Sequence, residues 1–148
     1  MNNSLTEEQV KVLNMSQSVI NEVRKVIIGK DEIIIKVLLS ILAGGHILIE
    51  DIPGVGKTTL AVALSKALSL DYKRLQFTPD VLPTDVTGFT ILNKETHKFE
   101  YKQGAALTNL FLADEINRTS SKTQSALLEV MEAVSYTHLR AHETSLHL

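Results

Sequence analysis

The chain has 148 residues, the length of one ordinary domain, with 44% hydrophobic and 22% charged residues and a formal net charge of −2. This charge provides no overall positive field for nucleic acid or an anionic membrane, so neither is an expected partner. Cysteine is absent, which excludes disulfides and cysteine metal sites and suits a cytoplasmic protein, and no stretch predicts a signal peptide or a membrane span.

The N-terminal region predicts two helices. Thr6-Glu7-Glu8-Gln9 is typical of a capping box, and the amphipathic pattern that follows predicts a helix to about Lys25. After a break at Val26–Gly29, we expect Asp31 to cap a second helix from Glu32 to about Ala43. This second helix is apolar nearly all round, so we expect it to be buried.

The next segment carries a phosphate-binding pattern. The apolar run from His46 to Glu50 predicts a strand, and residues Thr58 to Leu68 predict a helix. The loop between them fits the P-loop pattern G-x-x-x-x-G-K-[ST], except that Asp51 occupies the first glycine position. Backbone amides of such a loop, together with the start of the following helix, bind phosphate. The expected nucleotide-binding residues of this segment are Pro53, Gly54, Val55, Gly56, Lys57, Thr58 and Thr59.

Within this loop, Lys57 is expected to reach the β- and γ-phosphates, and the Thr58 hydroxyl to bind Mg²⁺. Gly54 and Gly56 suit a loop that needs positive φ and close backbone approach. The alternative is a chance glycine-rich turn between a strand and a helix. The apolar run before the loop and the helical pattern after it favour the P-loop.

The second half of the chain predicts strands, a hairpin and a helix. Tyr72 to Phe77 predicts a strand, and the proline-containing stretch from Thr78 to Asp85 predicts a loop. Phe89–Leu92 and Lys98–Tyr101 flank a polar turn and predict a β-hairpin. Lys122 to about Glu132 predicts a helix.

The apolar run from Leu110 ends in two carboxylates, Asp114 and Glu115, which is typical of a buried parallel strand with functional groups at its carboxyl end. We expect Asp114 to hold Mg²⁺ and Glu115 to activate the water that attacks the γ-phosphate. An isolated motif of this kind would indicate only a solvated strand end. Together with the P-loop, it favours a Mg²⁺-dependent NTPase over a P-loop kinase, with Glu115 and Lys57 as the expected catalytic residues.

Several separated motifs together resemble MoxR-type AAA+ ATPases over about residues 20–132. They are Gly45–Thr58, Gln76–Gly88, Leu112–Arg118 and Lys122–Glu129. The resemblance implies an α/β P-loop NTPase fold of the AAA+ type: a parallel sheet flanked by helices, here incomplete, with the hairpin as an insertion near a central pore. It also implies ATP and Mg²⁺ as cofactors, assembly into a homo-oligomeric ring, and chaperone-like remodelling of protein partners, which can include proteins with von Willebrand factor A domains.

The resemblance further places Ile28 and Gly29 at an adenine pocket, with ordinary core packing as an equal alternative. Arg118 would either face a neighbouring subunit or form a surface salt bridge. Two alternative functions stay open: a nucleotide-binding fragment without catalysis, and a subunit of a DNA-linked AAA+ ATPase.

The sequence departs from the family after Glu132. We expect residues 1–132 to be a partial AAA+ core and residues 133–148 to be an unrelated tail that is artefactual or disordered. His138 and His142 have the spacing of a helical metal site, but no third ligand accompanies them. In the family, a sensor strand lies between the P-loop strand and the strand of Asp114. Its absence here predicts marginal stability and poor ATP turnover.

Overall fold

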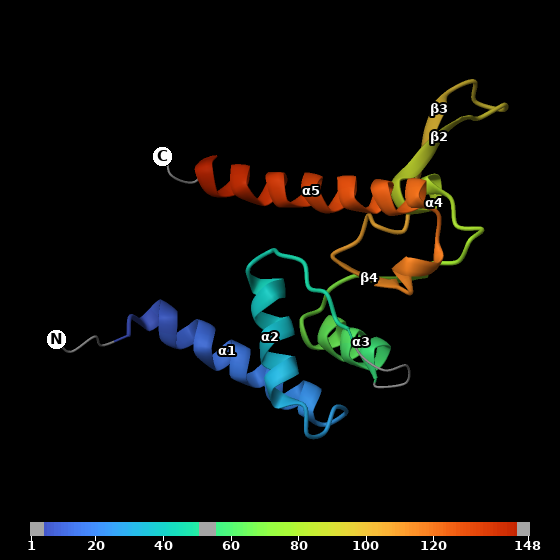
Figure 1. The fold of residues 1–148 in the computed structure, drawn as a ribbon. Helices are drawn as coiled ribbons and strands as arrows, with labels where there is room; N and C mark the ends of the chain where they lie inside the picture. Colours follow the sequence, from blue (N-terminus) through green and yellow to red (C-terminus); the bar gives the residue numbers. More distant parts are fainter. Residues whose placement is uncertain (1–4, 51–55, 145–148) are drawn as a thin grey trace. The chain divides into compact units, whose positions relative to one another are not determined.

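The computed structural model describes residues 5–50 and 56–144, with side chains described as far as residue 133. The chain divides into two units, Met1–Leu70 and Asp71–Leu148, and each is described by itself. Figure 1 shows the first unit from blue to green and the second from green to red. The expected α/β class is confirmed, because helices accompany a parallel pair of strands. No helix in the described residues is both long enough and apolar enough to cross a membrane.

The first unit consists of three helices: α1 (Glu7–Arg24), α2 (Asp31–Leu42) and α3 (Lys57–Ala67). The predicted capping box of α1 is confirmed. The backbone N–H of Gln9 donates to the Thr6 hydroxyl at 3.3 Å, and the backbone N–H of Thr6 donates to Gln9 Oε1 at 2.9 Å. These reciprocal bonds satisfy backbone donors that have no partner inside the helix, so they fix where α1 begins.

The prediction that Asp31 caps the second helix is wrong, because Asp31 is already the first helical residue and Lys30 is the cap. The Asp31 carboxylate instead accepts two hydrogen bonds from Arg24 at the end of α1, at 2.9 and 2.8 Å. The prediction that the helix is buried on all sides is also wrong. Only one face of α2 packs inward, and the large apolar residues on its exposed side are Ile33, Ile35, Leu39 and Leu42.

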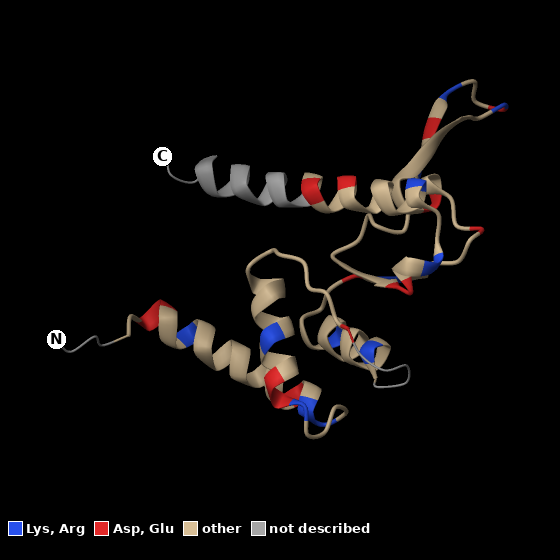
Figure 2. Cartoon of the chain, in the orientation of Figure 1, with Lys and Arg blue, Asp and Glu red and all other residues tan. Residues whose placement is uncertain are grey.

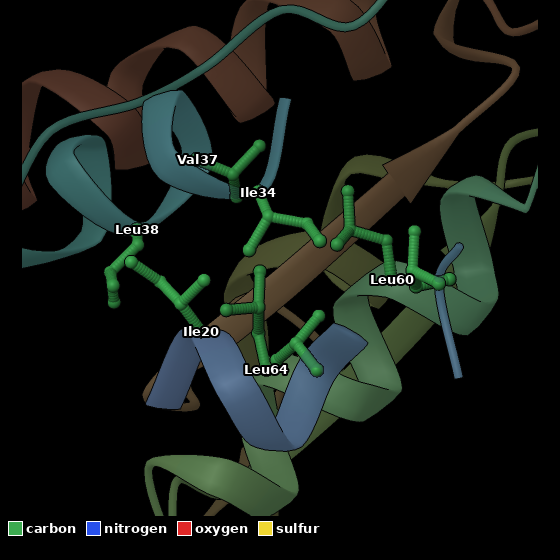
Figure 3. Close-up of a cluster of buried hydrophobic side chains, with 8 residues drawn as sticks. Ile20, Ile34, Val37, Leu38, Leu60 and Leu64 are labelled. Carbon is green, nitrogen blue, oxygen red and sulfur yellow. The ribbon is translucent and has the colours of Figure 1, made fainter. Parts of the chain in front are cut away.

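One hydrophobic cluster joins the three helices of this unit (Figure 3). Ile20 of α1 lies against Ile34 of α2, and Leu64 of α3 is completely buried between them. Burial of one such side chain stabilises the folded state by roughly 1.5–3 kcal/mol. The cluster therefore fixes α3 against α1 and α2. Its buried members are Ile20, Val23, Ile27, Ile34, Val37, Leu38, Leu60 and Leu64.

The predicted strand from His46 to Glu50 is not formed, since residues 45–50 belong to no helix or strand. An apolar run predicts that a segment can occupy a sheet, but a strand exists only where a neighbouring strand pairs with it. Among the described residues, the four assigned strands pair only with one another. Residues 46–50 thus have strand-like composition without a ladder partner.

The second unit contains the predicted parallel pair, β1 (Tyr72–Gln76) and β4 (Leu110–Asp114). Their register places Tyr72 opposite Leu110 and Gln76 opposite Asp114. A second cluster covers one face of this pair. It contains the buried residues Phe77, Val86, Ala106 and Leu127, with Leu75, Val81, Phe111, Ala113, Val130 and Met131 packed against them.

The predicted hairpin is confirmed as the antiparallel pair β2 (Gly88–Leu92) and β3 (Phe99–Gln103). The stretch expected as a loop before it contains a short helix, α4 (Pro83–Thr87), which begins with proline, a favoured first helical residue. After β4, the 3-10 turn η1 (Ile116–Arg118) leads into α5 (Ser121–Thr144). The helix expected to end near Glu132 therefore continues along the backbone to Thr144, because no proline or glycine interrupts it.

Candidate functional site

The residues expected to form the P-loop are described only from Gly56 onward; Asp51, Pro53, Gly54 and Val55 lie outside the described residues. Gly56 is the N-cap of α3 and has φ 85° and ψ 21°, in the left-handed region. A β-carbon at this position would meet nothing within 4 Å, so the backbone conformation, and not the available space, favours glycine here. Glycine at position 56 thus allows the left-handed backbone conformation with which α3 begins.

Lys57, Thr58 and Thr59 follow at the first turn of α3. This turn contains no acidic residue. The first backbone N–H groups of a helix have no partner inside the helix and carry its positive dipole end, so they attract anions. A lysine and two hydroxyl side chains are thereby placed where a phosphate group could bind.

Asp114 ends β4, and its carboxylate is held by a strand neighbour. The Arg74 Nη2 atom of β1 lies 2.7 Å from Asp114 Oδ2. The bond to Asp114 raises the pKa of the Arg74 guanidinium, which stays charged. The side chains of Arg74 and Asp114 are 40% and 26% exposed, so this ion pair lies at the surface of the unit.

Glu115 follows in an unusual backbone conformation, with φ 56° and ψ 40°. A non-glycine residue in the left-handed region carries strain, and such strain gathers at functional sites. The Glu115 carboxylate accepts a hydrogen bond from Arg118 Nη1 at 2.7 Å. This bond, with a further one from Gln76, lowers the pKa of Glu115. Arg118 was expected either to face a neighbouring subunit or to form a surface salt bridge, and in the structure it forms a salt bridge with Glu115.

The turn after Glu115 is anchored to α5. Gln124 Nε2 donates to the carbonyl of Ile116 at 3.0 Å. Thr123, which is completely buried, donates to the carbonyl of Val81 at 2.8 Å. Sequence reasoning missed Arg74, Thr123 and Gln124 as parts of this site. The polar Thr123-Gln124 pair at the start of an otherwise amphipathic helix was the only available signal.

Ile28 and Gly29, the expected adenine-pocket residues, lie between α1 and α2. Gly29 has φ 75°, and Ile28 is 86% exposed, so Ile28 is not part of the core, whereas its neighbour Ile27 is buried. Both line an open depression of about 350 Å³ together with Arg24, Ile27 and Asp31. The binding of adenine by Ile28 and Gly29 therefore stays a prediction.

The described residues contain no group of three or more histidine, cysteine, aspartate or glutamate side chains that could hold a metal ion by themselves. Mg²⁺ binds to one or two protein oxygens and completes its shell with water and substrate phosphates. The Thr58 hydroxyl and the Asp114 carboxylate are hard oxygen donors of the kind that Mg²⁺ requires. Each of these two groups, taken within its own unit, is therefore of a chemical type that suits a cation arriving with a phosphate ligand.

Comparisons with known proteins agree with these features. The profile of the family described as "ATPase family associated with various cellular activities (AAA)" matches residues 46–146. The uncharacterized protein YeaC of Bacillus subtilis is 55% identical over 118 residues, which cover 80% of this chain and 37% of YeaC. Chaperone MoxR1 of Mycobacterium tuberculosis is 41% identical over 111 residues, covering 75% of this chain and 29% of MoxR1.

The fold has a solved counterpart. The crystal structure of a candidate ATPase from Cytophaga hutchinsonii superposes with a TM-score of 0.69 and 42% sequence identity, over 86% of this chain and 41% of that protein. The chain thus spans well under half the length of these relatives.

Proposed function

Because this chain belongs to the ATPase family associated with various cellular activities (AAA) and is MoxR-like within it, we propose that it binds ATP with Mg²⁺ and hydrolyses it to ADP and phosphate. The observation that carries the proposal is the start of α3, where the left-handed Gly56 directly precedes Lys57 and Thr58. This is the arrangement that a phosphate-binding helix start requires.

The roles follow from the chemistry of each side chain. Lys57 and the first amides of α3 bind phosphate oxygens, joined in this proposal by Pro53, Gly54 and Val55 of the loop. Thr58 and Asp114 hold Mg²⁺, which when bound neutralises charge on the phosphates. Glu115 accepts a proton from the attacking water as that water's oxygen bonds to the γ-phosphorus and the bond to the ADP oxygen breaks. Glu115 is ionised at neutral pH, as a base must be, but its lowered pKa makes it a weaker proton acceptor, so its position directly after β4 carries the assignment.

We propose a protein-remodelling role for the complete activity, performed by a homo-oligomeric ring on a protein partner that can contain a von Willebrand factor A domain. The name of the relative MoxR1, a chaperone, supports the remodelling role. The β2–β3 hairpin adds a physical argument, because Phe99 and Tyr101 are 78% and 53% exposed. Exposed aromatic side chains of this kind favour contact with another polypeptide.

Nucleotide binding is tested with a fluorescent, non-hydrolysable ATP analogue. We expect the chain to bind the analogue and Lys57→Ala to weaken binding at least tenfold, since the loss of one buried charged contact to phosphate costs about 1.5–3 kcal/mol. Lys66→Ala is the matched control, because Lys66 is an exposed lysine in the last turn of the same helix. Equal loss in both variants would contradict the P-loop assignment.

Hydrolysis is tested separately by phosphate release. Glu115→Gln should retain nucleotide binding and lose turnover, because the amide keeps the shape of the carboxylate and cannot accept the proton. Turnover that is unchanged in Glu115→Gln would remove Glu115 from the catalytic role while leaving the binding proposal intact.

A further inference from the structure

The carboxylate proposed to bind Mg²⁺ already has a cation beside it. Arg74 Nη2 donates to Asp114 Oδ2 at 2.7 Å, and this is the only contact that Arg74 makes to the carboxylate among those seen in the described residues. Both side chains project from paired parallel strands at one sheet edge, where Gln76 lies opposite Asp114. The guanidinium thus reaches one oxygen of the very group that a divalent cation would use.

We propose that Arg74 is a built-in counter-cation of Asp114, which competes with the divalent cation for this carboxylate and so sets the Mg²⁺ concentration at which nucleotide is bound with its metal. The inference rests on the proposed function, since it concerns the metal that accompanies the nucleotide. It assigns to a residue of β1 a role that the P-loop and the Asp114-Glu115 motif do not contain.

The charges around Arg74 favour competition over simple support of the strand. Asp114 and Glu115 both act on Arg74 electrostatically, so the guanidinium belongs to a cluster of two carboxylates and two arginines with Arg118. Figure 2 shows acidic and basic segments next to each other where β4 leads into the following turn. A divalent ion at Asp114 would stand within a few ångströms of the fixed positive charge of Arg74, which repels it at short range.

Arg74 lies outside the hydrophobic core, so a substitution there can change the competition for Asp114 without disturbing the packing. Its side chain is 40% exposed and does not belong to the second hydrophobic cluster. Because an exposed ion pair contributes little to stability, a purely structural role would be small. The main consequence of the pair is therefore the partial neutralisation of Asp114.

The test measures Mg²⁺ dependence of nucleotide binding in the 148-residue chain. Mg²⁺ is titrated into the chain with the fluorescent, non-hydrolysable ATP analogue, and the midpoint is compared among the wild type, Arg74→Gln, Arg74→Lys and Lys36→Gln. We expect Arg74→Gln to lower the Mg²⁺ midpoint about three- to tenfold, since it removes a close like charge. Arg74→Lys should stay near the wild type because it keeps the charge.

Lys36→Gln is the matched control, because Lys36 forms an ion pair of 2.6 Å with Glu32 on α2, and neither residue lines the depression beside Ile28 and Gly29. It should leave the Mg²⁺ midpoint unchanged. Binding of the analogue in EDTA and the circular dichroism spectrum show whether each variant is folded. An unchanged or higher Mg²⁺ midpoint in Arg74→Gln, with binding in EDTA intact, would overturn the inference.

Failure of the proposed function looks different. In that case the wild type would not bind the analogue at any Mg²⁺ concentration, and Lys57→Ala would change nothing. A chain that binds nucleotide with the same Mg²⁺ dependence in all variants would retain the proposed function and reject only the role of Arg74.

Discussion

Glu115 combines two features that the sequence could not reveal together. Its position after an apolar run predicted a carboxylate at a strand end, and β4 ends as expected. Its left-handed backbone and its bond to Arg118 depend on how the chain turns into η1. A residue type at a motif position is therefore readable from sequence, whereas its partner depends on local geometry.

The contact between Glu115 and Arg118 leads to a prediction about pKa. Arg118→Gln should raise the pKa of Glu115 toward its ordinary value of 4.5, since the hydrogen bond from Arg118 is the largest cause of its lowered pKa. A lowered pKa stabilises the folded state above the unfolded value, and this contribution is lost as pH falls through the folded pKa. Between the folded pKa and about pH 4.5, the free energy of unfolding of the Arg118→Gln variant should therefore change less with pH than that of the wild type. Carboxyl carbon NMR titration of Glu115 measures the shift.

The control for this prediction is an equivalent pair elsewhere. Lys36 Nζ lies 2.6 Å from Glu32 on α2, and this bond lowers the pKa of Glu32. Lys36→Gln should therefore raise the pKa of Glu32 and leave Glu115 unchanged. If Arg118→Gln left the Glu115 titration where it was, the hydrogen bond would not exist in solution.

At the scale of elements, the sequence predicted structures that depend on residues close together in the chain, but not those that depend on distant partners. The capping box of α1 and the hairpin β2–β3 depend on residues close in sequence, so they were predicted correctly. The strand expected at His46–Glu50 needed a partner from elsewhere in the chain, and none of the described strands pairs with it. The pairing of Arg74 with Asp114 likewise required the register of β1 and β4.

The start of the hairpin depends on one glycine. Gly88 has φ 93° and ψ 176°, a region that essentially only glycine occupies, and an added β-carbon would overlap the carbonyl oxygen of Lys102. We expect Gly88→Ala to lower the free energy of unfolding by about 1–3 kcal/mol or more, measured by urea denaturation. Gly45→Ala is the control, because the nearest atom to its β-carbon is the Ser40 carbonyl oxygen at 3.6 Å. Equal denaturation midpoints for the two variants would show that the turn at Gly88 is not strained by a side chain.

The attachment of α5 to the segment before α4 depends on a buried hydroxyl. Thr123 is completely buried and donates to the Val81 carbonyl at 2.8 Å. Thr123→Val keeps the shape and removes the donor, which should cost about 0.5–1.5 kcal/mol of unfolding free energy, because the half-buried Val81 carbonyl keeps only its longer bond from Thr119, at 3.4 Å. Ser125→Ala, which removes a hydroxyl bonded only within the exposed side of the same helix, should change stability by less than about 0.5 kcal/mol. Comparable losses would indicate a general effect of hydroxyls on α5.

At the scale of the whole molecule, the residues that the structure describes form two hydrophobic clusters that share no residue. The sequence predicted most of the helices and strands, apart from the strand expected at His46–Glu50 and the short helix α4, but it did not predict this division. Burial of α2 on every side was expected from its composition, and only the face with Ile34, Val37 and Leu38 is buried. Composition gives the apolar content of an element, whereas the number of covered faces depends on its neighbours.

This division leads to a prediction about Leu64, the completely buried residue of α3 in Figure 3. Leu64→Ala should lower the unfolding free energy of the first unit by about 2–5 kcal/mol, because it removes methyl groups and leaves a cavity. Hydrogen exchange monitored by NMR should show faster exchange of amides in α1, α2 and α3, while amides of β4 keep their rates, since β4 packs in the other cluster. Leu39→Ala on the exposed side of α2, 59% exposed, serves as the control and should cost much less. Equal acceleration of β4 exchange by Leu64→Ala would mean that the two clusters unfold as one cooperative unit, so α3 and the strand of Asp114 would share a single unfolding free energy.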